Sequence, residues 1–184
     1  MKERTEKRQA SGIADHIALG LTTFGVGYIP GAPGTYGSAV GVGIYLAAVT
    51  VFGSLRYGAE LTAPESLVAM VHAAILIALA LFCLLGIWAS DRSIDLLGNS
   101  DPSEAVVDEV MGQLIVFLFI PFTSSCVLIA AGFFLFRLFD IWKPYPIDDL
   151  QHLKGGLGIC ADDIVAGVYA GICLAAGHAI YLFL

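Results

Sequence analysis

The stretch that decides the fold is DEVMGQLIVFLFIPFTSSCVLIAAGFFLFRLFD, residues 108–140. Its long interior contains no Asp, Glu, Lys or Arg, and charged residues stand at both of its ends. A single helix would place those ends on opposite sides of a membrane. Pro121 and the hydroxyl residues after it instead favour a turn at Pro121–Ser125, with short helices over 106–120 and 125–142. Such a hairpin returns both charged ends to one side.

Three further stretches, residues 36–55, 67–90 and 164–184, also lack charged residues. Each is close to the roughly 20 residues that a helix needs to cross a bilayer. The chain is 58% apolar and 14% charged, whereas ordinary globular domains are about 45–50% apolar and about 25% charged. We therefore predict an all-α integral membrane protein, a compact bundle of four to five membrane-embedded helices that includes the short hairpin. The predicted spans are Ser38–Gly53, Ser66–Ala89 and Ile164–Leu184.

The remaining segments set the domain organisation and the orientation. Residues 1–11 are polar and are predicted to form a mobile cytosolic tail, while residues 12–184 form a single membrane-embedded domain. Within that domain, residues 12–28 are predicted to form an interfacial helix. Lys and Arg gather on the side of the N-terminus and of the acidic clusters, so this side is predicted to face the cytosol. The net charge of -7 argues against nucleic-acid binding.

The first candidate site is PGAPGTYGS, residues 30–38, in which glycines recur just before a predicted helix. Gly34 would let a ligand approach the backbone, and Thr35 and Ser38 add hydroxyl donors. Backbone N–H groups at the start of a helix favour an anion, so these three residues are predicted to bind phosphate. The alternative is a flexible interfacial turn in which Ser38 caps the helix.

Five carboxylates are predicted to gather on one face of the bundle because they stand at three helix ends. Capping or the helix dipole explains one acid of each adjacent pair and leaves the other unexplained. Acids grouped near a low-dielectric boundary repel one another, and a hard divalent cation relieves that repulsion. All-oxygen ligation suits Mg²⁺. The predicted catalytic and metal-binding acids are Asp108, Glu109, Asp140, Asp162 and Asp163.

The segment FRLFDIWKPYP places Arg137, Asp140 and Lys143 at a spacing of three along one helical face. Pro144 disfavours helical geometry at the residue before it, so the helix is predicted to end there. An internal Arg137–Asp140 ion pair is one interpretation, but it leaves Lys143 without a partner nearby in the sequence. Phosphate binding by Arg137 and Lys143, beside a metal-binding Asp140, explains the three residues better.

These motifs, in this order, resemble the phosphatidylglycerophosphatase A family of bacterial membrane phosphatases. The matching segments are PGTYGS (33–38), DEVMG (108–112), FRLFDIWKPYPI (136–147) and GGLGICADDIVAG (155–167). The resemblance implies Mg²⁺-dependent removal of the terminal phosphate of phosphatidylglycerophosphate, giving phosphatidylglycerol. It also implies a multi-pass protein of the bacterial cytoplasmic (inner) membrane, with membrane lipid around it and residues 12–184 as the catalytic domain.

Two other functions fit parts of the pattern. A CDP-alcohol-type phospholipid transferase also gathers carboxylates and Mg²⁺ at the cytosolic face, although its continuous Asp- and Gly-rich signature is absent from this sequence. A non-enzymatic divalent cation carrier would also use acids in a membrane. Here the acids stand at the ends of predicted spans rather than in their middle, which counts against a carrier. The sequence does not set the oligomeric state.

Overall fold

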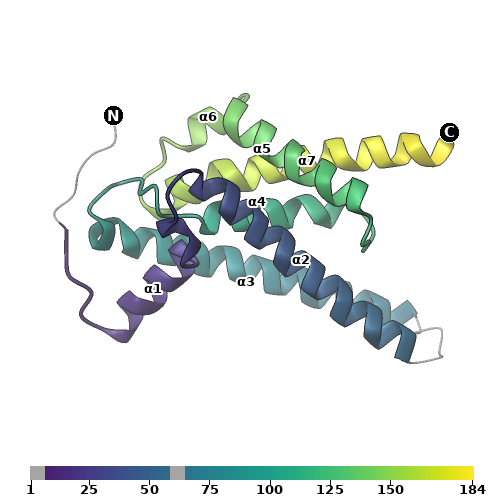
Figure 1. Cartoon of the computed structure of the whole chain (residues 1–184), viewed down its shortest axis with the longest axis horizontal. Helices are drawn as coiled ribbons and strands as arrows, with labels where there is room; N and C mark the ends of the chain where they lie inside the picture. The colour runs from purple at the N-terminus through teal and green to yellow at the C-terminus, as the bar shows by residue number, and fades with distance from the viewer. Residues whose placement is uncertain (1–6, 59–64) are drawn as a thin grey trace.

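The chain is helical throughout the part that the computed structural model describes, residues 7–58 and 65–184, where no strand occurs. This confirms the predicted all-α fold class. Residues 1–6 of the predicted tail lie outside the described residues. Two short 3₁₀ turns, Val26–Tyr28 and Phe117–Phe119, accompany the α-helices. The α-helices, shown in Figure 1, are α1 (Ile13–Thr23), α2 (Pro33–Gly58), α3 (Glu65–Leu97), α4 (Val107–Val116), α5 (Cys126–Trp142), α6 (Ile147–Leu150) and α7 (Gly156–Phe183).

Three of the described helices are long and apolar enough to cross a membrane. These spans are Pro33–Val51 of α2, Ala69–Leu97 of α3 and Gly156–Phe183 of α7. Along α3, large apolar side chains such as Leu76 and Leu84 are exposed. A continuous apolar surface of this size marks contact with a membrane. The three spans, together with two shorter helices, agree with the predicted count of four to five.

The predicted hairpin is confirmed. α4 continues into the 3₁₀ turn that ends at Phe119, and α5 begins at Cys126 and returns in the opposite direction (Figure 1). Tyr45 of α2 holds the turn, because its hydroxyl donates to the Thr123 carbonyl at 3.1 Å and accepts from the Thr123 N–H at 3.0 Å. The Tyr45 ring also stacks on Phe117 at 4.2 Å between centroids. The polar backbone groups of Thr123 are therefore hydrogen-bonded by a side chain from another helix, as a low-dielectric environment requires.

α7 is the central helix, with contacts to α3, α4, α5 and α6. Its buried face consists largely of small residues, including Ala166, Gly167 and Ala170. Small side chains let neighbouring helices approach closely, which is how helices associate within membranes. The larger core side chains come from the hairpin, where Phe117 and Phe136 pack against α7. The residues that α7 carries are consequently placed against both arms of the hairpin.

Several helices begin or end at other residues than predicted. α2 begins at Pro33 rather than Ser38, and α3 continues to Leu97 rather than ending at Ala89. α7 begins at Gly156, two turns before the predicted start at Ile164. The interpretation of Asp162-Asp163 as helix-opening residues is therefore wrong.

The cause of the early start of α7 is a contact from another helix. The Gly156 N–H donates to Asp91 Oδ1 of α3 at 3.0 Å, so α3 caps α7. Gly155 supplies the preceding turn with a φ of 69°, a conformation that favours glycine. A glycine-rich segment that is typical of a loop therefore forms the N-terminal end of a long helix.

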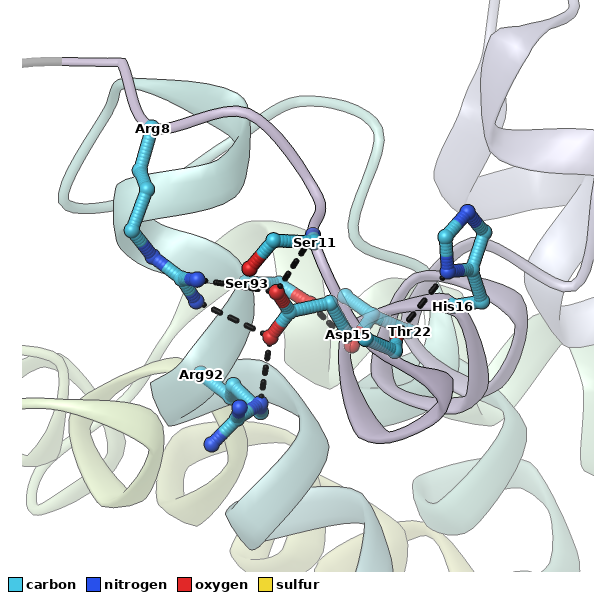
Figure 2. Close-up of polar contacts among 8 residues, drawn as sticks. Arg8, Ser11, Asp15, His16, Thr22, Arg92 and Ser93 are labelled. Carbon is cyan, nitrogen blue, oxygen red and sulfur yellow. Dashed lines mark hydrogen bonds and ion pairs between the residues drawn. The ribbon is translucent and has the colours of Figure 1, made fainter.

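A cluster of charged residues ties the described N-terminal segment to α1 and α3 (Figure 2). Asp15 is buried, and its carboxylate accepts two hydrogen bonds from Arg8 at 2.8 and 2.9 Å, one from Arg92 at 2.7 Å and one from the Ser11 N–H at 3.0 Å. The hydrogen bond from Arg8 is the main cause that holds the pKa of Asp15 below its ordinary value. The Arg8 N–H also donates to the Asp95 carbonyl at 2.8 Å. Residues 8–11 of the predicted tail are thus anchored on the bundle.

Candidate active site

Three of the five predicted acids converge. Asp108 and Glu109 stand in the first turn of α4, and Asp163 stands two turns into α7. Each offers a carboxylate oxygen, and these oxygens all lie within 4.8 Å of one another. Asp163 is buried, whereas Asp108 and Glu109 are partly exposed. Carboxylates from two helices therefore face one another at one end of the bundle.

Two glycines bring these acids together. A Cβ on Gly112 would lie 2.6 Å from the Asp163 carbonyl oxygen and would overlap the Phe136 ring, and a Cβ on Gly167 would overlap the Gly112 carbonyl. The absence of a side chain at Gly112 and Gly167 therefore lets α4 and α7 approach each other closely. Gly112 follows Asp108 by four residues, and Gly167 follows Asp163 by four. The acids therefore lie one turn away from the point of closest approach.

The other two predicted acids are paired with cations. Arg137 Nη1 lies 2.7 Å from Asp140 Oδ2, so the internal ion pair considered for α5 is present. Lys143 donates to Asp162 Oδ2 at 2.5 Å, which gives the lysine a partner from α7 rather than from its own segment. α5 ends at Trp142, as Pro144 predicts, and Lys143 has a φ of 47°. The negative charge of Asp140 also contributes to the raised pKa of Glu109.

The carboxyl groups at the start of α4 are placed where they favour either protonation or the binding of a cation. The pKa of Asp108 is raised to about 6, mainly by burial against the surrounding protein and also by the charge of Asp162. Burial and the neighbouring Asp108 raise the pKa of Glu109 well above its ordinary value. For Lys143, burial alone would lower the pKa, but the ion pair with Asp162 outweighs it and the pKa rises. Lys143 therefore stays charged at neutral pH.

The donor set fits a hard cation. Glu109 Oε2 is buried and has no hydrogen-bond partner among the described residues, and the same is true of Asp162 Oδ1. Unpaired buried acceptors are costly, so a missing positive partner is expected at these oxygens. The converging groups are all carboxylates, without His or Cys. This oxygen-only chemistry suits Mg²⁺ rather than zinc.

From Pro33 onward the glycine motif is part of α2 rather than of a loop before it. Pro33 stands at the first helical position, where its fixed φ favours helix formation. Ser38 is buried and its hydroxyl donates to the Gly34 carbonyl at 2.9 Å, so the interpretation of Ser38 as the helix cap is wrong. Thr35 lies in the first turn, where its N–H donates to the Ala32 carbonyl at 3.0 Å.

Gly34 brings this first turn of α2 to the acids. A Cβ at this position would overlap Glu109 Oε1 and would lie 3.0 Å from Arg137 Nη1. The glycine therefore borders two predicted site residues from different helices. Gly34 therefore lies against both a predicted metal ligand and a predicted phosphate ligand.

One polar residue that lies near the acids was not selected from the sequence. Gln113 is fully buried, and neither its amide oxygen nor its amide nitrogen has a partner among the described residues. Gln113 follows Glu109 by four residues. It packs against Gly41 of α2, where an added Cβ would lie only 2.9 Å from the Gln113 Cβ. A lone amide four residues after an acid, in an apolar helix, is the signal that points to it.

Comparison with known proteins identifies the family. The family model described as phosphatidylglycerophosphatase A matches residues 19–178. The chain belongs to the phosphatidylglycerophosphatase A family. All four motifs that carry the resemblance lie inside this match, and the chain is accordingly a phosphatase.

Three curated relatives resemble the chain over most of its length. An Escherichia coli protein named phosphatidylglycerophosphatase A is 34% identical and covers 84% of this chain and 80% of its own. A Haemophilus influenzae protein of the same name is 35% identical, with 85% of each covered. A Bacteroides thetaiotaomicron protein named "Putative phosphatidylinositol-3-phosphatase" is 36% identical and covers 84% of this chain and 88% of its own. No solved structure matches the chain.

Proposed function

We propose that this phosphatase requires Mg²⁺ and hydrolyses the terminal phosphate of phosphatidylglycerophosphate, giving phosphatidylglycerol and phosphate. The observation that carries the proposal is the convergence of Asp108, Glu109 and Asp163 beside two cations, Arg137 and Lys143. A phosphomonoester needs positive charge on its oxygens, and the carboxylates need a counter-ion. The names of the Escherichia coli and Haemophilus influenzae relatives support the substrate.

Each group then has a distinct role. Asp108, Glu109 and Asp163 would hold the metal, which would neutralise phosphate oxygens and make a water molecule available as the nucleophile. Arg137 offers five N–H donors, so it holds Asp140 and still binds a phosphate oxygen. Lys143 supplies a second positive charge from the end of α5. Gly34 keeps the first turn of α2 clear of Glu109 and Arg137 so that both side chains reach the substrate.

The proposed orientation places this chemistry at the cytosolic face of the inner membrane. α2, α4 and α7 begin at the same end of the bundle, where α3 and α5 end (Figure 1). Arg8, Arg92, Lys143 and Lys154 belong to this end, whereas Arg56 is the only Lys or Arg in residues 54–66 between α2 and α3. An excess of Lys and Arg marks the cytosolic side.

Phosphate release from phosphatidylglycerophosphate in detergent micelles tests the proposal directly. We expect release with Mg²⁺, none with EDTA, and recovery when Mg²⁺ is added back in excess. Asp163→Asn should abolish turnover, whereas Asp149→Asn, an exposed acid on α6, should leave it unchanged. Near-normal turnover of folded Asp163→Asn would overturn the metal assignment.

Two substrate tests and one transport test separate the alternatives. Release of phosphate from phosphatidylinositol 3-phosphate in place of phosphatidylglycerophosphate would favour the activity named for the Bacteroides relative. Release of CMP from CDP-diacylglycerol would favour a transferase. Flux of Mg²⁺ into liposomes without phosphate release would favour a cation carrier.

A further inference from the structure

A groove of about 330 Å³ is lined by residues that are close in the sequence to Gly34 and Asp108. One wall is the loop over residues 27–33 that leads into α2, and the other is Ser103 with Glu104, shortly before α4. The walls touch, because a Cβ on Gly27 would overlap the Glu104 carbonyl oxygen. This volume is at the lower end of the range for small-molecule pockets, roughly 300–1,000 Å³.

Both segments that line the groove continue along the chain toward the acids. Pro33 lines the groove, and the next residue, Gly34, borders Glu109 and Arg137. On the other side, Glu104 lines the groove and Asp108 follows it by four residues. A substrate whose phosphate lies between the acids and Arg137 would therefore place its adjoining atoms next to the groove.

The lining suits hydroxyl groups rather than a phosphate. Among the residues that the structure describes, no Lys or Arg lines the groove, so they offer a phosphate no positive partner there. Glu104 is partly exposed, and the Ser103 hydroxyl donates to its Oε2 at 3.3 Å, which leaves capacity for further hydrogen bonds. Tyr28 is 58% exposed and adds a phenolic donor. A carboxylate beside two hydroxyls is the chemistry that binds a polyol.

We propose that this groove is the headgroup subsite and binds the polyol that carries the scissile phosphate. The inference rests on the proposed lipid phosphatase function and names the part of the substrate that this chain reads. Glu104 accepts a hydrogen bond from a polyol hydroxyl, and Tyr28 donates one. Sites built around such hydrogen bonds discriminate strongly against ligands that lack the hydroxyl.

Calorimetric titration of the full chain in detergent, with Mg²⁺ present, tests the subsite through binding. The ligands are glycerol 3-phosphate, inositol 3-phosphate and inorganic phosphate. We expect the wild type to prefer a polyol phosphate to inorganic phosphate, and the preferred one identifies the polyol. Glu104→Ala should weaken its binding about tenfold and leave inorganic phosphate unchanged, since a hydrogen bond to a charged group is lost. Tyr28→Phe, at an exposed position, should give a smaller loss of the same kind.

Three results would overturn the subsite: no preference of the wild type over inorganic phosphate, an equal loss for all ligands in Glu104→Ala, or unchanged polyol binding in both variants. Asp149→Ala, on exposed α6, is the matched control and should bind like the wild type. These results do not depend on turnover. A wild type that binds polyol phosphates selectively but releases no phosphate from any lipid would overturn the proposed function and keep the subsite.

Discussion

Gly34→Ala tests whether α2 is shaped to leave room for the predicted ligands. The added Cβ would overlap Glu109 Oε1, and it would lie 3.2 Å from Glu109 Cδ and 3.0 Å from Arg137 Nη1. Ordinary contacts begin at 3.4 Å, so both side chains must give way. Both are side-chain ends from other helices, so they can move without displacing a backbone. The perturbation therefore acts on the site more than on the fold.

The expected magnitude follows from this displacement. Moving Glu109 or Arg137 by roughly 1 Å should lower kcat/KM about a hundredfold, the usual effect of misplacing a catalytic group by that distance. Stability should not fall in parallel, because Ala favours a helix over Gly by about 1 kcal/mol. The assay pairs phosphate release at saturating Mg²⁺ with thermal unfolding in the same detergent.

Gly43→Ala is the matched control, since it lies on the same helix and a Cβ there would meet nothing within 4 Å. It should retain wild-type kcat/KM. The reasoning is refuted if Gly34→Ala stays within about twofold of the wild type, or if both variants lose activity equally. A Gly34→Ala variant with a lowered Tm and proportionate loss of activity would also refute it, because the effect would then be structural.

Three further predictions concern packing, pH and the cationic groups. Gly112→Ala should destabilise the fold by about 1–3 kcal/mol, measured by thermal unfolding, because its Cβ would meet the Asp163 backbone of α7 and the fully buried Phe136 ring, neither of which can move aside freely. Asp15→Asn should speed tryptic cleavage after Arg8 at neutral pH. In the wild type, hydrogen exchange should show the full protection from this contact above the ordinary Asp pKa of about 4. The protection should decline below that pH and be lost as the pH falls through the lowered folded-state pKa of Asp15. Lys143→Met should lower kcat/KM at least tenfold and leave Asp162 without its cation, whereas Lys143→Arg should restore part of the activity.

Two of these variants have a matched control. Gly177→Ala in α7 is the control for Gly112→Ala, because nothing lies within 4 Å of its Cβ, and it should leave thermal unfolding unchanged. Lys154→Met removes an exposed lysine and should retain activity. An unchanged tryptic pattern in Asp15→Asn would show that Arg8 is held by its backbone contact to Asp95 alone. Full activity of Lys143→Met would exclude a role for that charge in binding phosphate.

The parts of the fold that the sequence predicts are those decided locally. The turn between α4 and α5 follows from Pro121 and the hydroxyl residues after it, and it lies where that chemistry places it. The end of α5 follows from Pro144 in the same way. Long uncharged runs likewise identify α2, α3 and α7 because the length of a span is a property of one segment.

Helix starts in glycine-rich segments could not be predicted, because contacts from other helices decide them. Gly156 has a low intrinsic helix propensity, yet it begins α7 because Asp91 of α3 accepts its N–H. A Cβ there would also overlap the Ile87 carbonyl, so the glycine is required by close packing rather than by a loop. The residue that makes the helix possible is 65 positions away in the sequence.

The same distinction applies to the acids. The positions of the five carboxylates at predicted helix ends place them on one face. The sequence does not distinguish among them, because pairing with a cation depends on the fold. Lys143 reaches Asp162 across 19 residues, and this contact separates Asp162 from the group formed by Asp108, Glu109 and Asp163. The two paired acids thereby hold Arg137 and Lys143 beside the three converging ones. An arriving phosphate then needs only to compete with Asp140 and Asp162 for cations that are already in place, which lowers the cost of ordering long side chains on binding. Asp140→Asn and Asp162→Asn should therefore raise KM more than they lower kcat, whereas Asp163→Asn should abolish kcat.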